Sequence, residues 1–158
     1  AYYYKAATDP SMRKTWLVLL RGGGWCLSES ACKRRPAQLR TSKVWPHSVE
    51  KTSIFSNGHD DYLHSLWRGR GSPLAGANLV WMPYCSGDAF MGDAERWGLQ
   101  FRGYRIIRSA MRHLVRDKGL GKEADSMLVF GGWSAGARGA MAHLDTIHEV
   151  VPEGTRII

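Results

Sequence analysis

The strongest chemical signal in the sequence is a serine placed between two glycines. Residues 131–136 read Gly-Gly-Trp-Ser-Ala-Gly, with Gly132 two positions before Ser134 and Gly136 two positions after it. This spacing is typical of a nucleophile elbow, a sharp strand-to-helix turn that exposes a serine hydroxyl above a sheet. The N-terminus of the following helix favours negative charge beside that hydroxyl. We therefore predict Ser134 as a nucleophile, with a plain glycine-rich turn as the alternative.

An earlier stretch, Gly22-Gly23-Gly24, follows the apolar run that ends at Leu20. Acyl transfer needs two or three fixed N–H donors where the oxyanion forms, and esterases carry a glycine-rich loop for this purpose after an early strand. We predict that the N–H groups of Gly23, Gly24 and Ala135 form an oxyanion hole. A flexible turn and a phosphate-binding nest are the alternatives. The glycines lack both the Gly-Lys-Ser/Thr of a P-loop and the Gly-x-Gly-x-x-Gly spacing of a dinucleotide site.

A third loop, residues 83–93, mixes polar and aromatic side chains after another apolar run. Asp88 is a candidate hydrogen-bond acceptor for a substrate. Capping of a loop turn is the commoner role of aspartate, and we favour that role for Asp93. This loop and the residues beside the two glycine motifs give four predicted pocket residues: Trp25, Asp88, Phe90 and Trp133.

A nucleophilic serine needs a base, and the base needs a carboxylate that orients it. In the elbow fold both groups follow the serine in the sequence. Only His143 and His148 follow Ser134, and both fall on the helix that the elbow begins. At about 1.5 Å of rise per residue they are roughly 13 and 21 Å from Ser134 along the helix axis. Asp145 is excluded for the same reason, so we expect the acid and the His outside residues 1–158.

The other histidines precede the serine, which is the wrong order for this fold. Surface positions are the default for all six: His47, His59, His64, His113, His143 and His148. No pair among them forms a zinc motif, so we expect no metal. Acyl transfer by a serine also needs no organic cofactor.

The elements that must position these residues follow from apolar patterning. Runs bounded by breakers predict strands over 15–20, 78–82, 126–130 and 155–158. Periodic apolar residues predict helices over 103–118, closed near Gly119 or Gly121, and over about 135–150. The second helix has a predicted buried stripe: Ala137, Ala140, Met141, Leu144, Ile147 and Val151. Residues 51–77 predict a long irregular loop. The order of strands and helices predicts a parallel α/β sheet, with the three motifs at the carboxyl ends of its strands.

Several blocks of the sequence resemble the pectin acetylesterase/Notum family in order and spacing. They are Tyr2-Tyr3-Tyr4, Trp16–Leu20, Gly22–Cys26, Pro83–Phe90, Phe101-Arg102-Gly103 and Ser134-Ala135-Gly136. The resemblance implies a single partial α/β-hydrolase-like domain over residues 1–158, truncated at its C-terminal end. It further implies a secreted or lumenal carboxylesterase that removes O-acyl groups, such as acetyl from pectin or palmitoleate from Wnt proteins.

The family pattern places the nucleophile on Ser134, the oxyanion donors near Gly23-Gly24 and on Ala135, and the acid and His downstream. It also implies a short-loop disulfide between Cys26 and Cys32, and a partner for Cys85 that this chain lacks. Two departures bear on substrate identity. Arg21 stands where many members have an acidic residue, and Trp133 precedes the nucleophile where small or polar residues are usual.

Composition bounds these expectations. The chain has 158 residues, 44% of them hydrophobic, and a formal charge of +8, which indicates one domain with a genuine core. The longest apolar run has five residues, far below the roughly 20 of a membrane span. Residues 1–70 hold 12 Lys and Arg against 5 Asp and Glu. The basic residues include two clusters, Lys33-Arg34-Arg35 and Arg68-Gly69-Arg70. We treat this charge as a solvated surface and expect no nucleic-acid partner, because neither cluster lies in a nucleic-acid-binding motif.

We thus expect a monomeric serine carboxylesterase whose substrate is an acylated polysaccharide or an acylated protein. The alternative is a non-catalytic binding relative, or a fragment of this fold that is inactive by itself.

Overall fold

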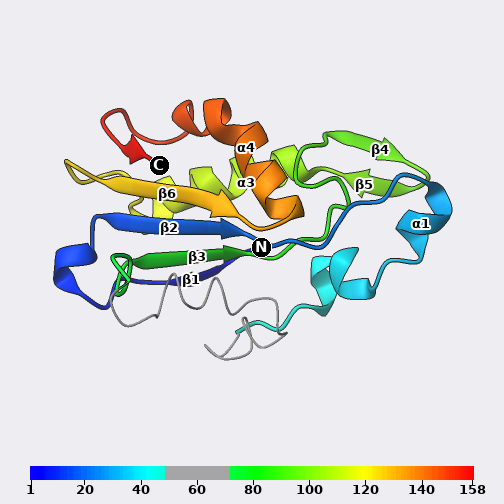
Figure 1. Ribbon diagram of the computed structural model, residues 1–158, viewed down its shortest axis with the longest axis horizontal. Helices are drawn as coiled ribbons and strands as arrows, with labels where there is room; N and C mark the ends of the chain where they lie inside the picture. Colours follow the sequence, from blue (N-terminus) through cyan, green and yellow to red (C-terminus); the bar gives the residue numbers. More distant parts are fainter. Residues whose placement is uncertain (49–71) are drawn as a thin grey trace.

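The computed structural model describes residues 1–48 and 72–158. A five-stranded sheet lies at its centre (Figure 1). Its strands are β1 (Tyr3–Lys5), β2 (Thr15–Leu20), β3 (Asn78–Met82), β6 (Met127–Gly132) and β7 (Arg156–Ile157). They lie in the order β1-β3-β2-β6-β7. β1 runs antiparallel to β3, whereas the other neighbours are parallel. The carboxyl ends of β2, β3 and β6 therefore share one edge of the sheet.

The two longest helices among the described residues are α3 (Gly103–His113) and α4 (Ala135–His148). α3 continues as a π-helical segment over Leu114–Lys118, which ends at Gly119 in the left-handed region. The remaining elements are shorter: α1 (Glu29–Lys33), the hairpin β4 (Ala94–Arg96) and β5 (Leu99–Phe101), and three single 3-10 turns over Pro10–Met12, Ala37–Leu39 and Ser42–Val44.

Strand β2 is buried along its whole length. Val18 and Leu20 point into the larger apolar cluster, whereas Leu17 and Leu19 belong to a second cluster. Successive side chains on a strand face opposite sides of the sheet, so the two clusters lie on its two faces. Burial on both faces explains why the sequence of β2 is continuously apolar.

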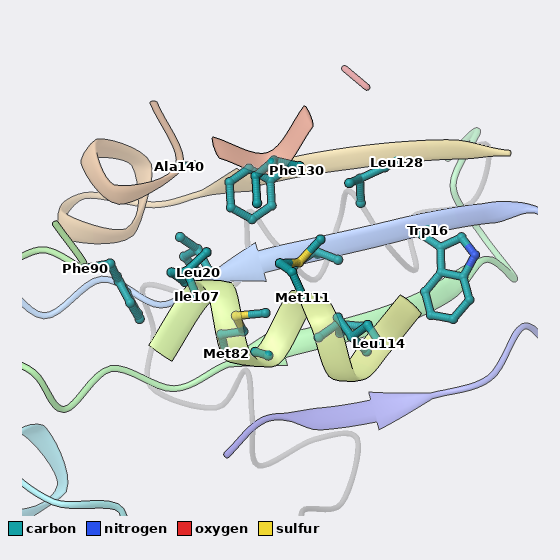
Figure 2. Packing of buried hydrophobic residues seen from close by; sticks show 14 of the residues in the cluster. Trp16, Leu20, Met82, Phe90, Ile107, Met111, Leu114, Leu128, Phe130 and Ala140 are labelled. Atoms are coloured by element: carbon teal, nitrogen blue, oxygen red, sulfur yellow. The ribbon is translucent and has the colours of Figure 1, made fainter. Parts of the chain in front are cut away.

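Helices α3 and α4 both contribute to the larger cluster, so both pack on the same face of the sheet. Ile107 and Met111 of α3 lie over β2, and Ala140 comes from α4 (Figure 2). Ile107 and Met111 are fully buried, and burial of a side chain of this size stabilises the fold by roughly 1.5–3 kcal/mol. This packing fixes the start of α4 against the end of β2, and Ser134 lies at that start.

Most predicted elements are confirmed. β2 and β3 match their predicted bounds, both helices are present, and the parallel α/β arrangement is correct. The third strand begins one residue later than predicted and extends to Gly132. β1 and the β4–β5 hairpin were not predicted, because each is only three residues long and has no fully buried residue. Of the predicted loop over 51–77, residues 51–71 lie outside the described residues, and residues 73–76 form a turn.

The predicted buried stripe of α4 is wrong at two positions. Met141 and Leu144 are exposed, at 74% and 42% of their surface, whereas His143 is buried at 1%. Small residues decide which face packs: a Cβ on Gly139 would lie 2.7 Å from the Ala89 carbonyl oxygen. The helix therefore packs through its glycine and alanine side rather than through its largest apolar side chains.

Candidate active site

Ser134 lies at the N-cap of α4, directly after β6 and Trp133. Its backbone has φ 53° and ψ −118°, a positive-φ conformation that a non-glycine residue adopts only under strain. The residue is exposed, and its side chain makes no capping hydrogen bond. A hydroxyl left free at a helix N-terminus lies where developing negative charge is stabilised.

The glycines on either side of Ser134 allow the strand and the helix to touch. A Cβ on Gly132 would lie 2.6 Å from the Gly136 carbonyl carbon, and a Cβ on Gly136 would overlap the Leu20 carbonyl. These neighbours are backbone atoms that cannot move aside. The elbow geometry therefore requires glycine at both positions.

The glycine-rich loop after β2 lies against the serine. A Cβ on Gly22 would lie 3.1 Å from the Ser134 Cβ and 2.9 Å from the Trp133 carbonyl oxygen. The Trp133 N–H donates to the Leu20 carbonyl at 3.2 Å. Between described residues, no hydrogen bond outside the regular elements uses the N–H of Gly23, Gly24 or Ala135. The structure thus brings the two predicted motifs together at the carboxyl edge of the sheet.

The loop after β3 joins the same edge. The Arg21 N–H donates to the Met82 carbonyl at 3.0 Å, and the Cys26 N–H donates to the Gly87 carbonyl at 3.2 Å. Phe90, a predicted pocket residue, is 1% exposed and belongs to the core. Its contacts favour a role in holding this loop against the helices.

Asp88 has both carboxylate oxygens occupied within its own loop and at the start of α3. Oδ1 accepts from the Ser86 hydroxyl at 2.5 Å and from the Phe90 N–H at 2.9 Å. Oδ2 accepts from the N–H groups of Gly92 and Gly103, at 3.0 and 2.8 Å. These four donors leave little capacity for a substrate, so the geometry favours a structural role over the predicted pocket role.

The two tryptophans beside the glycine motifs differ in exposure. Trp25 has 42% of its surface exposed, and the Arg138 guanidinium lies 4.6 Å from its ring centroid. Trp133 is half-buried against the second apolar cluster. Both remain candidates for the walls of a pocket, and Trp25 is the more accessible of the two.

The prediction that all histidines lie on the surface is wrong for His143. Its Nε2 lies 2.7 Å from the Phe90 carbonyl oxygen, and its ring stacks on Tyr104 with centroids 5.3 Å apart. The helix turns this side chain into the core and away from the serine. His47, His113 and His148 are exposed, and His59 and His64 lie outside the described residues.

The disulfide implied by the family resemblance is confirmed. Cys26 and Cys32 are bonded, with Cα atoms 5.1 Å apart, and the link ties the end of the glycine-rich loop to α1. Cys85 is a free thiol, and burial raises its pKa.

Two residues near the glycine loop were missed by sequence reasoning. Arg35 donates from Nη2 to the Gly23 carbonyl at 2.6 Å, and its guanidinium lies 5.6 Å from the ring centroid of Tyr84. Tyr84 is fully buried, and burial raises its pKa to about 12. Arg35 is the last of three consecutive basic residues, and the sequence gives no sign that it differs from the other two. Its contact with the glycine loop follows from the Cys26–Cys32 disulfide, which holds α1 beside that loop.

In the part of the chain that the structure describes, no helix has the length and apolar character needed to cross a membrane.

Comparisons with known proteins identify the family and the fold of the chain. The family model described as pectinacetylesterase matches residues 1–158. The palmitoleoyl-protein carboxylesterases notum1 of Xenopus laevis and NOTUM of Mus musculus are 32% and 31% identical over 97% of this chain, which covers 30% and 29% of their lengths. A crystal structure of the Wnt deacylase Notum from Drosophila aligns with a TM-score of 0.74 at 27% identity, over 99% of this chain and 44% of that one.

The chain therefore spans less than a third of the length of these curated relatives. The fold is α/β-hydrolase-like and aligns with that structure over nearly all of the residues of this chain. Because the family model matches from the first residue to the last, the chain belongs to the pectinacetylesterase family.

Proposed function

We propose that the protein is a carboxylesterase that removes O-acyl groups with Ser134 as its nucleophile. The observation that carries this proposal is the position of Ser134: an exposed hydroxyl on a strained elbow, at a helix N-terminus, in contact with the glycine-rich loop. The names of the relatives, palmitoleoyl-protein carboxylesterase and Wnt deacylase, support the same class of reaction.

The proposed reaction proceeds in two steps. A base outside residues 1–158 takes the Ser134 proton while the serine oxygen attacks the ester carbonyl carbon. The N–H groups of Gly23, Gly24 and Ala135 stabilise the oxyanion, and the C–O bond to the alcohol breaks as the protonated base returns its proton to that alcohol. Water then attacks the acyl-serine in the same way and releases the carboxylic acid and the free serine. No metal or organic cofactor enters these steps.

The substrate class follows from the family: an acylated protein or an acylated polysaccharide. The Cys26–Cys32 disulfide supports an oxidising compartment, so we infer that the protein acts in a secreted or lumenal setting. Trp25, which is exposed beside the glycine loop, is a candidate wall for the acyl group.

Labelling with a fluorophosphonate tests this function. The natural polypeptide that contains these residues should react with the probe and hydrolyse p-nitrophenyl butyrate. Ser134→Ala should abolish labelling and lower turnover at least about 10³-fold, because removal of a serine nucleophile costs many orders of magnitude. Ser109→Ala, which alters an exposed serine on α3, should behave as the wild type. A folded protein that is never labelled would instead identify a non-catalytic relative.

A further inference from the structure

The contacts of Arg35 are unusual for a cation. It is half-buried, its Nη2 donates to the Gly23 carbonyl at 2.6 Å, and its Nε is buried without a partner. Among the described residues, no carboxylate lies within ion-pair distance of its guanidinium. A solvated arginine would avoid the cost of burying an unpaired charge. Within the described residues, the Gly23 carbonyl is the hydrogen-bond acceptor that the Arg35 guanidinium binds.

Three features hold Arg35 in this place. The Cys26–Cys32 disulfide ties α1 to the end of the glycine-rich loop, and the Arg35 N–H donates to the Cys32 carbonyl at 3.3 Å. The ring of Tyr84 lies against the guanidinium, 5.6 Å from centroid to charge. The arginine is thus fixed from both its backbone and its side chain.

The Gly23 carbonyl and the Gly24 N–H belong to one peptide unit. The peptide bond between them is trans, because the described residues contain no cis peptide bond, so the two groups point in opposite directions from the same plane. Anchoring the carbonyl on Arg35 therefore fixes the direction of the Gly24 N–H. Gly23 also lies directly against the Tyr84 ring, because a Cβ added to this glycine would be only 2.9 Å from a ring carbon. The loop therefore has no space to shift toward Tyr84. A charged donor on the carbonyl also polarises the peptide and strengthens its N–H as a donor.

We propose that Arg35 is a positioning residue for the oxyanion hole: it holds the Gly23–Gly24 peptide so that the Gly24 N–H faces the developing oxyanion. This inference rests on the proposed function, in which Ser134 is the nucleophile and Gly24 an oxyanion donor. Arg35 touches no reacting atom. It acts through a peptide, so its loss should affect the transition state and leave substrate binding in the ground state unchanged.

Two substitutions in the natural full-length protein separate this role from a purely structural one. Arg35→Met removes the charge and the donor, and Arg35→Lys keeps the charge but loses the planar guanidinium. For p-nitrophenyl butyrate we expect Arg35→Met to lower kcat about 10- to 100-fold, less than the full loss of one oxyanion donor, with KM changed less than threefold. Arg35→Lys should fall between this variant and the wild type.

A transition-state analogue gives the second readout. A trifluoromethyl ketone forms a tetrahedral adduct with a serine, so its Ki should rise by the same factor as kcat/KM falls across the Arg35 variants. Arg34→Met changes the exposed neighbour of Arg35 and should leave kcat, KM and Ki within twofold of the wild type.

The outcomes distinguish the two proposals. Turnover that survives Ser134→Ala overturns the proposed function and the role of Arg35 with it. If Ser134→Ala loses turnover while Arg35→Met keeps the kcat and Ki of the wild type, only the positioning role of Arg35 is overturned. A rise in KM at constant kcat also overturns it. If Arg35→Met does not fold, Arg35→Lys decides by the same kcat and Ki comparison.

Discussion

Tyr84 links the glycine-rich loop to the loop that follows β3. Its ring packs beneath Gly23 and lies 4.7 Å from the ring of Phe90, and its hydroxyl accepts a hydrogen bond from the Ala89 N–H at 2.6 Å. Burial raises the pKa of Tyr84 to about 12. The phenol therefore stays protonated throughout the physiological range and keeps its place under the loop.

The raised pKa makes the contribution of Tyr84 to stability depend on pH. The folded protein holds the phenol proton more tightly than the unfolded chain does, so this contribution is complete below pH 10 and is lost as pH rises toward 12. Tyr84→Phe should cost about 1–3 kcal/mol of unfolding free energy at pH 7, because the Ala89 N–H loses its acceptor. Its free energy of unfolding should then fall less steeply than that of the wild type between pH 10 and 12. Denaturant titrations at each pH measure both effects, and parallel curves would contradict the argument.

At the scale of elements, apolar patterning predicted the strands that are completely buried and missed the strands that are only partly buried. β2 and β3 are buried on both faces and were predicted to the residue. The edge strand β1 and the β4–β5 hairpin are partly exposed and carry no such signal. The face of α4 was misjudged at Met141 because close approach to the Ala89 carbonyl selects Gly139, and apolar periodicity does not register small residues.

The junction of β2 with α4 gives a prediction at this scale. Gly136→Ala would place a methyl group into the Leu20 carbonyl, a backbone atom within the sheet. We expect a loss of more than about 3 kcal/mol in unfolding free energy, at the upper end of the cost of overpacking, together with loss of esterase activity. Gly131→Ala is the matched control, since its Cβ would meet nothing nearer than 4.0 Å. Urea unfolding of both variants checks this, and equal stability of the two would contradict the close-approach argument.

At the scale of the whole molecule, three loops that are distant in the sequence meet at one edge of the sheet. The parallel arrangement of the strands could be anticipated from the alternation of strands and helices, which is why Ser134 and the glycine loop could be placed at the same edge of the sheet. The partners of Asp88 and Arg35 were not. Both side chains contact residues in other segments of the chain, such as Gly103 for Asp88 and Gly23 for Arg35. Apolar periodicity predicts helices and strands but does not predict such contacts between segments. The parts of the site formed by backbone are therefore more predictable than those formed by side chains.

Asp88 joins the edge of the sheet to the helical layer. Its carboxylate accepts two hydrogen bonds within the 86–90 turn and two from the N–H groups of Gly92 and Gly103, the latter being the first residue of α3. A carboxylate at a helix N-terminus is also stabilised by the helix dipole. One side chain thus fixes the position of the loop after β3 relative to the helix that covers the core.

Asp88→Asn separates this structural role from direct substrate binding. The amide retains one oxygen acceptor, but an NH2 group replaces Oδ2, which accepts from the N–H groups of Gly92 and Gly103. These two N–H groups would then face a donor and would have no acceptor. We expect a loss of about 3 kcal/mol in unfolding free energy by urea titration at pH 7, with the KM of the remaining folded enzyme close to that of the wild type. Asp93→Asn is the control, because that carboxylate lies at the surface and among the described residues pairs only with Arg102 and Arg105. Its loss of unfolding free energy should be much smaller. Unchanged stability with a raised KM in Asp88→Asn would place the carboxylate in the substrate pocket instead.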